Sequence, residues 1–499
     1  MSLRRLVRPL DFVPDPEEAY RALFAGRSGS FWLDGEVFAP KGWGRSILGA
    51  AEGNAGILLR YRLAPQTLTL TTLGESRTEQ VDDFLRYLDD VLQRSGRAIG
   101  GSDDATPETE SASLVAVGYL GYEMKAQTCG RVGHRSPFPD AAFVLADRLL
   151  FLDHCGGRSL LVAIDDPPEA SRWLNAAAAR LAVLPRSQPG AREVTVAGVP
   201  DAGFDVWTDP GIRRRHERFE YLTRIARCQE EIRAGNAYEI CLTTTVRAPK
   251  KTPALELFTH LRRVNPAPFS AFLDFPDAAV VSSSPELFLA VGPDGTVESA
   301  PIKGTRPRGR TAAEDRRLRE ELVCSEKDRA ENVMIVDLVR HDLGRVCRIG
   351  SVHVPRLLAV ETYPTAHHLV STIRGQLRPP YRAVDAVRAA FPPGSMTGAP
   401  KIRVMDILDE LEGGPRGIYS GAVGWFSADR TAHLAVAIRT AVVGADGVHV
   451  GAGGAVTALS DPQAEVNEVH VKAAAVLGNL PACADQSKTS GSVRLRFNS

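Results

Sequence analysis

The sequence predicts an α+β fold, in which strands and helices are mixed along one large globular chain. Three observations predict it. The 499 residues are 44% hydrophobic and 24% charged, which is ordinary for a globular protein with a sizeable core. Apolar runs of strand length alternate with segments of helical spacing. From about Arg214 onward, glycine-rich turns separate these segments.

In chain order, the first two hundred residues mix both element types. Helix-like segments cover 16–26 and 81–95, and strand-like runs cover 142–153 and 159–165. A charged amphipathic helix at 216–234 follows, and alternating strands and helices continue from there. We expect that this later part of the chain carries the chemistry.

The organisation of the chain follows from its polar interruptions. Two stretches, 95–113 and 184–204, are polar or rich in proline and glycine, which is typical of exposed connections. We therefore expect an N-terminal region at 1–205, a catalytic region at 214–480 and a disordered tail at 481–499.

Composition excludes several classes of protein. The 60 basic residues balance 60 acidic residues, so the chain lacks the basic footprint of a nucleic-acid binder. No apolar run approaches the 18 residues of a membrane span, and the amino terminus does not resemble a secretion signal. The seven cysteines form no CxxC pair, which indicates free thiols. We expect a cytoplasmic protein that binds neither membrane nor nucleic acid.

Two predicted helices carry paired carboxylates at helical spacing. The first covers 325–346, and the second begins at Asp461-Pro462 and ends near Gly478. The pairs are Asp328 with Glu331 on the first helix and Glu465 with Glu468 on the second. Residues three apart share a helix face, so the four carboxylates could hold a hard cation such as Mg²⁺. The alternative is a solvated charged face.

Two further residues stand in settings that favour chemistry. Glu286 lies in SSSPELF, between two apolar runs, so it should stand at a strand end or in a hairpin. Burial there would raise its pKa and let it act as a general acid; the alternative is a turn carboxylate. Lys303 lies in PIKGTRPRG, where prolines and glycines fix the backbone. A lysine with a lowered pKa can act as a nucleophile; the alternative is a surface ion pair.

Two glycine-containing segments suit anions. FPPGSMTGAPK, at 391–401, precedes a predicted helix, and we expect the backbone amides of Gly394, Ser395, Thr397 and Gly398 to be exposed there. The segment lacks the order of a Walker loop. Farther on, Arg439 follows a predicted strand, and glycines at 451–454 precede the second acidic helix. An arginine fork with such a backbone would bind a small dicarboxylate; the alternative is a strand-end arginine and a tight turn.

Six segments taken together resemble one family. They occur in the order SSSPELF, PIKGTRPRG, EKDRAENVMIVDLVRHDLGRV, FPPGSMTGAPK, IYSGAVGWFS and SDPQAEVNEVHVKA. In this order they resemble the chorismate-utilising enzymes, which include anthranilate, aminodeoxychorismate, isochorismate and salicylate synthases. The resemblance is strong over 219–480 and loose over the first two hundred residues. It implies two β-sheets packed face to face with helices on the outside, and a Mg²⁺-dependent site for chorismate.

The resemblance also implies roles for individual residues. Glu331 and Glu468 would bind the metal directly, and Asp328 and Glu465 would support it through water. His368 would lie near the leaving group. The residues that would hold substrate are Gly304, Thr305, Ser395, Tyr419, Arg439, Gly453 and Lys472. His341 and Ala455 depart from the family pattern, where asparagine and glycine are usual, but neither replaces a proposed ligand.

Lys303 points to one branch of the family. Anthranilate synthases usually have alanine there, whereas PIKGT resembles the aminodeoxychorismate synthases. The resemblance implies that the lysine amine attacks ring carbon 2, that Glu286 protonates the departing 4-hydroxyl, and that ammonia then adds at carbon 4 and expels the lysine. In isochorismate and salicylate synthases a lysine that activates water occupies the place of Glu239, so water addition lacks its base here.

Partners and alternatives complete the expectations. Cys129 and Cys155 lack the sequence surroundings of a glutaminase nucleophile, so we expect a separate glutamine amidotransferase to supply the ammonia. We also expect a separate lyase to convert the product on the way to folate. One alternative is anthranilate synthase component I, which serves tryptophan synthesis. Another is a non-catalytic relative that binds the amidotransferase. Trp32 weakly resembles part of a tryptophan site in relatives, but core packing is the preferred interpretation.

Overall fold

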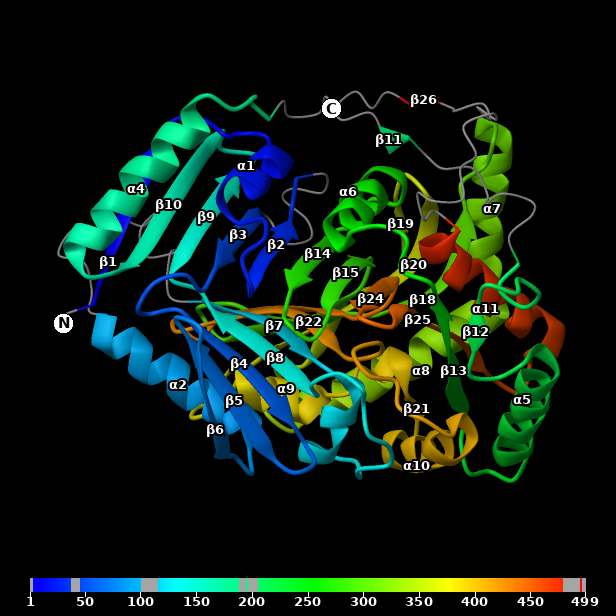
Figure 1. Ribbon diagram of the computed structural model, residues 1–499. Coiled ribbons are helices and arrows are strands. Elements are labelled where there is room, and N and C mark those ends of the chain that lie inside the picture. The colour runs from blue at the N-terminus through cyan, green and yellow to red at the C-terminus, as the bar shows by residue number, and fades with distance from the viewer. Residues whose placement is uncertain are drawn as a thin grey trace.

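The computed structural model describes residues 3–36, 45–99, 115–187, 194–195, 205–478 and 494–495. Two large antiparallel sheets pack face to face, and helices lie on the outside (Figure 1). The expected α+β class and its two-sheet architecture are therefore confirmed. Among the described residues, no helix combines the length and apolar character that crossing a bilayer would require.

The first sheet combines strands from both ends of the chain. Its order is β1 (Arg4–Leu10), β10 (Arg158–Asp165), β9 (Arg148–Asp153), β3 (Ser46–Ala50), β2 (Ser30–Asp34), β14 (Phe269–Asp274), β15 (Ala279–Ser284), β24 (Thr440–Gly444), β25 (Gly447–Val456), β13 (Glu239–Ala248) and β12 (Arg213–Arg214), with β21 (Gly398–Ala399) beside β13. Strand β25 lies between β24 and β13, with Gly453 opposite Thr243.

The second sheet is built in the same way. Its order is β18 (Ile302–Pro307), β20 (Ala366–Gln376), β17 (Thr296–Ala300), β16 (Leu287–Val291), β23 (Ala432–Val436), β22 (Ala422–Ser427), β7 (Val115–Leu120), β8 (Ala141–Leu145), β4 (Ile57–Arg62), β5 (Thr67–Thr72) and β6 (Glu75–Gln80), with β19 (His353–Thr362) beside β20. The sequence regions 1–205 and 214–480 thus contribute to both sheets. A short pair, β11 (Val194–Thr195) with β26 (Arg494–Leu495), stands apart.

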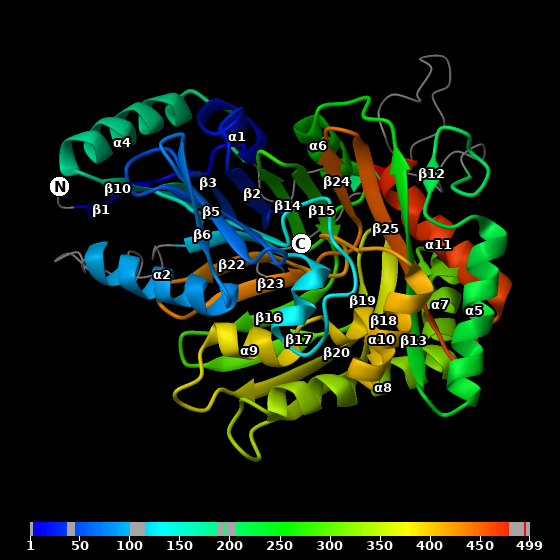
Figure 2. The same ribbon diagram turned by 60° about the horizontal axis from the view of Figure 1, so that its bottom comes forward.

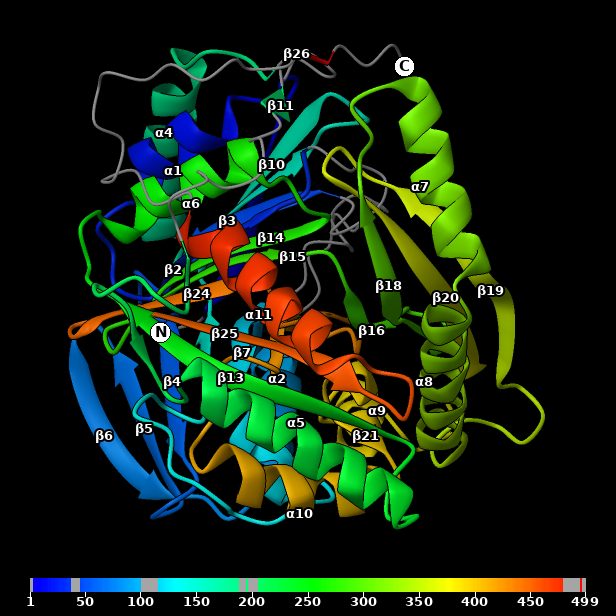
Figure 3. The same ribbon diagram turned by 90° about the vertical axis from the view of Figure 1, so that its right-hand side faces the viewer.

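Helices cover the outer faces. They are α1 (Pro16–Leu23), α2 (Phe84–Ile99), α4 (Pro167–Ala182), α5 (Arg218–Arg233), α6 (Ala254–Val264), α7 (Ala312–Cys324), α8 (Glu326–Gly344), α9 (Ala383–Ala390), α10 (Lys401–Glu412) and α11 (Pro462–Leu477), with 3₁₀ turns η1 (Tyr122–Gln127) and η2 (Gly394–Met396). Helices α8 and α9 lie beside the second sheet (Figure 2). Helix α11 crosses the first sheet over β25, with α5 alongside (Figure 3).

Burial on both faces explains why the strands read as apolar runs. In β2, Phe31 and Leu33 belong to the core shared by the two sheets, whereas Trp32 packs under the helices outside the first sheet. Such strands need apolar side chains in both directions, so strict alternation is lost. Trp32 is fully buried and its ring lies 5.0 Å from that of Phe258, which confirms the core-packing interpretation.

Three sequence-based boundaries need correction. The run at 142–153 is two strands in different sheets, β8 and β9, because the chain crosses between the sheets at 146–147. The glycines at 451–454 lie within β25 and form no tight turn. Helix α2 continues to Ile99, into the stretch expected to be a connection. The rest of that stretch, most of 184–204 and the expected tail at 481–499, apart from 494–495, lie outside the described residues.

Candidate active site

Glu286 lies where the chain passes from one sheet to the other. Strand β15 ends at Ser284 in the first sheet, and β16 begins at Leu287 in the second, so the strand-end expectation holds but no hairpin forms. The Glu286 side chain is buried, and its Oε1 accepts a hydrogen bond from Ser395 Oγ at 2.5 Å. Burial raises the pKa of Glu286 to about 7, although Ser395 and Lys303 oppose the rise. The carboxyl can therefore hold a proton near neutral pH.

Lys303 lies on β18 at an irregular point of the sheet. Between Ile302 and Thr305 the pairing of β18 with β20 shifts register, so the strand carries an extra residue. Gly304 has a φ of +92°, and a Cβ there would lie 2.9 Å from the Asp328 Cβ. Glycine thus permits the close approach of β18 to α8. The Lys303 side chain turns inward and the residue is only 8% exposed.

The partner of Lys303 is Glu239, the first residue of β13. Lys303 Nζ donates to Glu239 Oε1 at 2.5 Å, and Glu239 is fully buried. Burial by itself would lower the pKa of Lys303, but the charges of Glu239, Cys241 and Glu331 outweigh it, and the pKa is raised. The sequence-based reasoning that burial would lower this pKa is therefore wrong in direction, because it did not include the buried carboxylate.

Thr305 and His368 meet across β18 and β20. The Thr305 hydroxyl and His368 Nδ1 lie 2.9 Å apart, and the Tyr363 ring lies 5.5 Å from the imidazole. Burial, with the nearby charges of Arg439 and His367, lowers the pKa of His368 to about 3. His368 is thus a neutral hydrogen-bonding group at physiological pH.

The predicted acidic helices bring their carboxylates together. Lys327 Nζ lies 2.5 Å from Glu465 Oε1 and 3.6 Å from Glu331 Oε1, so one ammonium bridges α8 and α11. Burial raises the pKa of Glu331 to about 7, and Glu239 and Glu468 add to the rise. Glu468 pairs with Lys472 at 2.6 Å; burial would raise its pKa, but Lys472 outweighs it and the pKa is lowered.

The fourth carboxylate, Asp328, faces a different cation. Its Oδ2 lies 3.0 Å from an Arg306 guanidinium nitrogen. The cluster as it stands is thus a set of ion pairs, and across the described part of the chain no three acidic, histidine or cysteine side chains are arranged to hold a metal ion. Buried oxygens of Glu331 and Glu465 have no hydrogen-bond partner among the described residues. Carboxylate oxygens of this kind are ligands that Mg²⁺ prefers, so the donor chemistry fits.

Strand β25 and the residues packed against it form another side of the candidate active site. Lys472 Nζ donates to the Gly453 carbonyl oxygen at 2.8 Å, and a Cβ on Gly453 would lie 2.3 Å from the Leu242 carbonyl oxygen. Tyr419 is buried with its ring directly against Gly451. Arg439 is partly buried. Its positive charge helps to lower the pKa of His368. Burial lowers the pKa of Arg439 itself, and the negative charge of Glu468 opposes that effect.

The segment at 391–401 differs from the expectation of an open anion loop. The amides of Met396 and Thr397 donate to Pro393 and Gly394 carbonyls inside turn η2, so the Thr397 amide is not exposed. Short 3₁₀ turns use their amides internally, and α10 begins only at Lys401. What the segment offers to the site is the Ser395 hydroxyl, which bonds Glu286.

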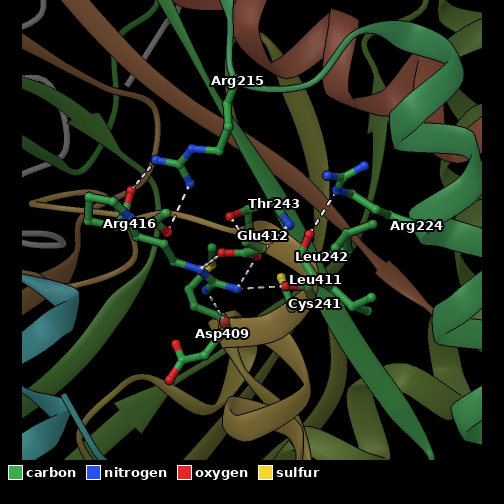
Figure 4. A network of polar contacts seen from close by, with 12 residues as sticks. Arg215, Arg224, Cys241, Leu242, Thr243, Asp409, Leu411, Glu412 and Arg416 are labelled. Carbon is green, nitrogen blue, oxygen red and sulfur yellow. Dashed lines mark hydrogen bonds and ion pairs between the residues drawn. The ribbon is translucent and has the colours of Figure 1, made fainter. Parts of the chain in front are cut away.

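A buried polar network holds that segment against β13. Arg416 donates to the carbonyl oxygens of Met396 at 2.6 Å and Cys241 at 2.9 Å, and to both carboxylate oxygens of Glu412 (Figure 4). Glu412 also accepts from the Thr243 amide at 2.8 Å. Sequence reasoning missed this network. Its only signal was a charged pair four apart at the end of α10.

The two positions that depart from the family pattern lie outside the group of side chains around Lys303. His341 is exposed on α8, and Ala455 lies in β25 opposite Cys241, so neither departure alters the site. A separate cavity of about 410 Å³ is lined by Pro285, Leu287 and Ile302 among others. None of the residues predicted for catalysis lines it, so the candidate site is defined by the side-chain chemistry around Lys303.

Comparison with known proteins agrees with this geometry. The sequence pattern of the family described as chorismate binding enzyme matches residues 58–478. An aminodeoxychorismate synthase from Streptomyces pristinaespiralis is 43% identical over 98% of this chain and 68% of its own length. One from Streptomyces griseus is 46% identical over 95% of this chain and 64% of its own length. The chain thus spans about two thirds of these relatives.

A solved structure of an anthranilate synthase component has the same overall fold as this chain. The crystal structure of anthranilate synthase component I from Streptococcus pneumoniae TIGR4 superposes with a TM-score of 0.67 at 26% identity, over 87% of this chain and 92% of that one. The fold and the order of the sequence segments therefore point to the same family.

Proposed function

Because the chain belongs to the chorismate-binding enzyme family, we propose that it catalyses the amination step of aminodeoxychorismate synthase. Chorismate and ammonia would give 4-amino-4-deoxychorismate and water. The observation that carries the proposal is the buried Lys303 amine, which faces inward beside Glu239 and within reach of the charges of Glu331 and Glu286. The identity to two aminodeoxychorismate synthases supports the same choice.

The first half of the reaction uses Lys303 and Glu286. The neutral Lys303 amine attacks ring carbon 2, both ring double bonds shift by one position toward carbon 4, and the bond between carbon 4 and its hydroxyl oxygen breaks. Glu286 is suited to give its proton to that oxygen, which leaves as water, because its pKa of about 7 keeps a protonated fraction at neutral pH.

The second half reverses the allylic shift. Ammonia attacks carbon 4, both ring double bonds shift back to their original positions, and the bond between carbon 2 and Lys303 breaks. The new ammonium group passes one proton to the Glu286 carboxylate, which restores the acid. One chorismate and one ammonia are thus converted to one aminodeoxychorismate and one water, with no oxidant or reductant.

Several side chains are placed to hold the substrate. Arg439 and Lys472 supply positive charge for the carboxylates, and the hydroxyls of Thr305 and Tyr419 can hydrogen-bond to polar substituents. His368, neutral and bonded to Thr305, is suited to orient that hydroxyl.

The carboxylates of α8 and α11 would hold Mg²⁺, with Glu331 and Glu468 as direct ligands and Asp328 and Glu465 in support. When bound, the ion would neutralise a substrate carboxylate and stabilise developing negative charge. Lys327 and Lys472, which now pair with Glu465 and Glu468, would have to release them.

Ammonia would come from a glutamine amidotransferase, and the product would go to a lyase on the way to folate in the cytoplasm. A second candidate, anthranilate synthase component I, is favoured by the superposition on a protein of that name. The two differ in where nitrogen is attached. Lys303 occupies carbon 2 in the proposed route, whereas anthranilate formation needs ammonia at that carbon.

The test is product analysis by mass spectrometry, with chorismate, Mg²⁺ and ammonium, with and without a glutaminase. We expect aminodeoxychorismate and no fluorescent anthranilate. Anthranilate formed without a lyase would reject the proposal in favour of the second candidate, and absence of any product would favour a non-catalytic relative. Replacing Lys303→Ala should reduce aminodeoxychorismate formation at least 100-fold, on the order expected for loss of a catalytic group. An unchanged rate would exclude covalent catalysis by Lys303.

A further inference from the structure

Lys303 is hydrogen-bonded to a carboxylate for which the described part of the chain offers no second hydrogen-bond donor. Glu239 Oε1 accepts from Lys303 Nζ at 2.5 Å, and Glu239 Oε2 is buried with no partner among the described residues. Glu239 is 0% exposed and Lys303 is 8% exposed. A buried carboxylate is normally held by several donors because the loss of hydration is costly. Among the residues that the structure describes, Glu239 has one side-chain donor, and that donor is the proposed nucleophile.

The protonation state of the amine makes this contact important. Only a neutral amine can attack carbon 2, yet the pKa of Lys303 is raised, because the charges of Glu239, Cys241 and Glu331 outweigh the effect of burial. The amine must therefore give up a proton before it reacts. Bulk water is a poor acceptor for a group that is 8% exposed.

Other titratable groups around the pair are less suited to accept that proton. They come from every packed element: Cys241 on β13, Glu286 beside β16, Glu331 on α8, and Glu468 and Lys472 on α11. Glu286 is already bonded to Ser395, and its proposed task is to give a proton to the leaving oxygen. Glu239 is hydrogen-bonded to Lys303 Nζ, whereas none of these five groups is, as far as the described residues show.

We propose that Glu239 is the general base for Lys303, which accepts one proton from the ammonium before attack and returns it when the lysine leaves carbon 2. This inference rests on the proposed function. In the first half, one N–H bond of Lys303 breaks, Glu239 becomes the neutral acid, and the Nζ lone pair forms the bond to carbon 2. In the second half, that bond breaks and the departing amine regains its proton from Glu239. The pair holds the same number of protons before and after each turnover.

Proton transfer between Lys303 and Glu239 should affect the pH dependence of kcat, which a purely structural ion pair would not. Because the proton moves within the pair, release of the amine does not depend on the concentration of protons in water. With Glu239→Gln, the pKa of Lys303 falls, but Lys303 no longer has a hydrogen-bonded carboxylate that can take its proton before attack and return it when the lysine leaves. We expect kcat for aminodeoxychorismate at pH 7.5 to fall about 100-fold or more, and the ratio of variant kcat to wild-type kcat to rise with increasing pH. Glu239→Asp keeps a carboxylate, although a shorter side chain places it farther from the Lys303 amine. Its kcat should therefore fall less, and its pH profile should keep the shape of the wild-type profile.

The chain offers a matched control. Lys401 and Asp342 form a second buried pair at 2.6 Å, with exposures of 8% and 4%, and Asp342 has no place in the proposed reaction. Asp342→Asn should reduce thermal stability without adding an ionisation to the pH profile of kcat. If it adds the same rising limb as Glu239→Gln, or if Glu239→Gln has the wild-type rate and profile, the proposal is overturned.

A second measurement does not depend on turnover. Cyanate carbamylates neutral amines, so the pH dependence of Lys303 labelling, followed by peptide mass spectrometry of the full chain, reports its deprotonation. We expect Glu239→Gln to move the midpoint of labelling to lower pH and Asp342→Asn to leave it in place. An unmoved midpoint in Glu239→Gln would overturn the coupling. Failure of the wild-type chain to form aminodeoxychorismate would instead reject the proposed function, so the two failures are distinguishable.

Discussion

Ser395 and Glu286, 109 residues apart in the chain, are joined by a hydrogen bond of 2.5 Å in a buried setting. The bond favours the ionised carboxylate, whereas burial favours the protonated one, and burial dominates. The serine therefore limits how far the pKa of Glu286 rises. This balance places the ionisation near neutral pH, where the proposed acid has to work.

The pH profile of turnover should report that balance. Glu286 is protonated below its pKa of about 7, so a step that needs the acid should slow as pH rises through 7. Removing the hydroxyl with Ser395→Ala removes a stabiliser of the ionised form, so the alkaline limb of kcat should move to higher pH. Glu286→Gln should abolish that limb and lower kcat about 100-fold or more. A shift of the limb to lower pH in Ser395→Ala would contradict the assignment.

The buried pair of Arg416 and Glu412 should be important for stability. Their side chains are 1% and 3% exposed, and each makes further hydrogen bonds to the segment at 391–401 or to β13 (Figure 4). Removing one partner leaves an uncompensated buried charge, so Arg416→Met should cost about 3–5 kcal/mol of unfolding free energy. Glu412→Gln with Arg416→Met should cost less than the sum of the two single changes. Additive losses in denaturant unfolding would show that the two side chains do not interact.

The site could be predicted from sequence where the chemistry is local. Glu286, Lys303 and the paired carboxylates were found because small residues, prolines or helical spacing surround them. Position 239 was considered only because isochorismate and salicylate synthases have a lysine there. The ion pair between Glu239 and Lys303 was missed. That pair joins residues 64 positions apart on strands of different sheets, and no local spacing encodes it.

The fold shows the same limit. Element types were predicted well for long helices such as α5 and α11, where apolar spacing and an N-cap act locally. The crossing between β8 and β9 was missed because both strands are apolar on both faces, so their runs merge in the sequence. The interleaving of N-terminal and later strands depends on long-range pairing that one sequence does not reveal.

Metal dependence should be measurable apart from turnover. Chelation with EDTA should stop aminodeoxychorismate formation, and Mg²⁺ should restore it. If Glu331 and Glu468 bind the ion, Mg²⁺ should raise the melting temperature of the wild type, because binding to the folded state alone adds about 2.7 kcal/mol at 100 times the Kd. Glu331→Gln and Glu468→Gln should each reduce that shift. Glu298→Gln, which removes a carboxylate that pairs with Arg374, should keep the full shift. Equal shifts in all three variants would place the ion elsewhere.

His216 should make the chain less stable in mild acid. The residue is 3% exposed, its Nε2 donates to the Glu412 carbonyl oxygen at 3.0 Å, and its Nδ1 has no hydrogen-bond partner among the described residues. Burial, with the charges of Arg224 and Arg215, lowers its pKa to about 4. A histidine with a lowered folded-state pKa contributes stability that is present above its unfolded pKa of about 6.5 and is lost as pH falls toward 4.

The comparison that isolates this effect is between wild type and His216→Phe, which cannot be protonated. Between pH 7 and pH 5 the wild type should lose about 2 kcal/mol of unfolding free energy relative to the variant, because the unfolded histidine takes up a proton that the folded one does not. The phenylalanine also loses the bond to Glu412, so the variant should be less stable at pH 7, and the difference should narrow or reverse at pH 5. Urea unfolding at both pH values measures it. A difference that stays constant would show that His216 is protonated equally in the folded and unfolded states.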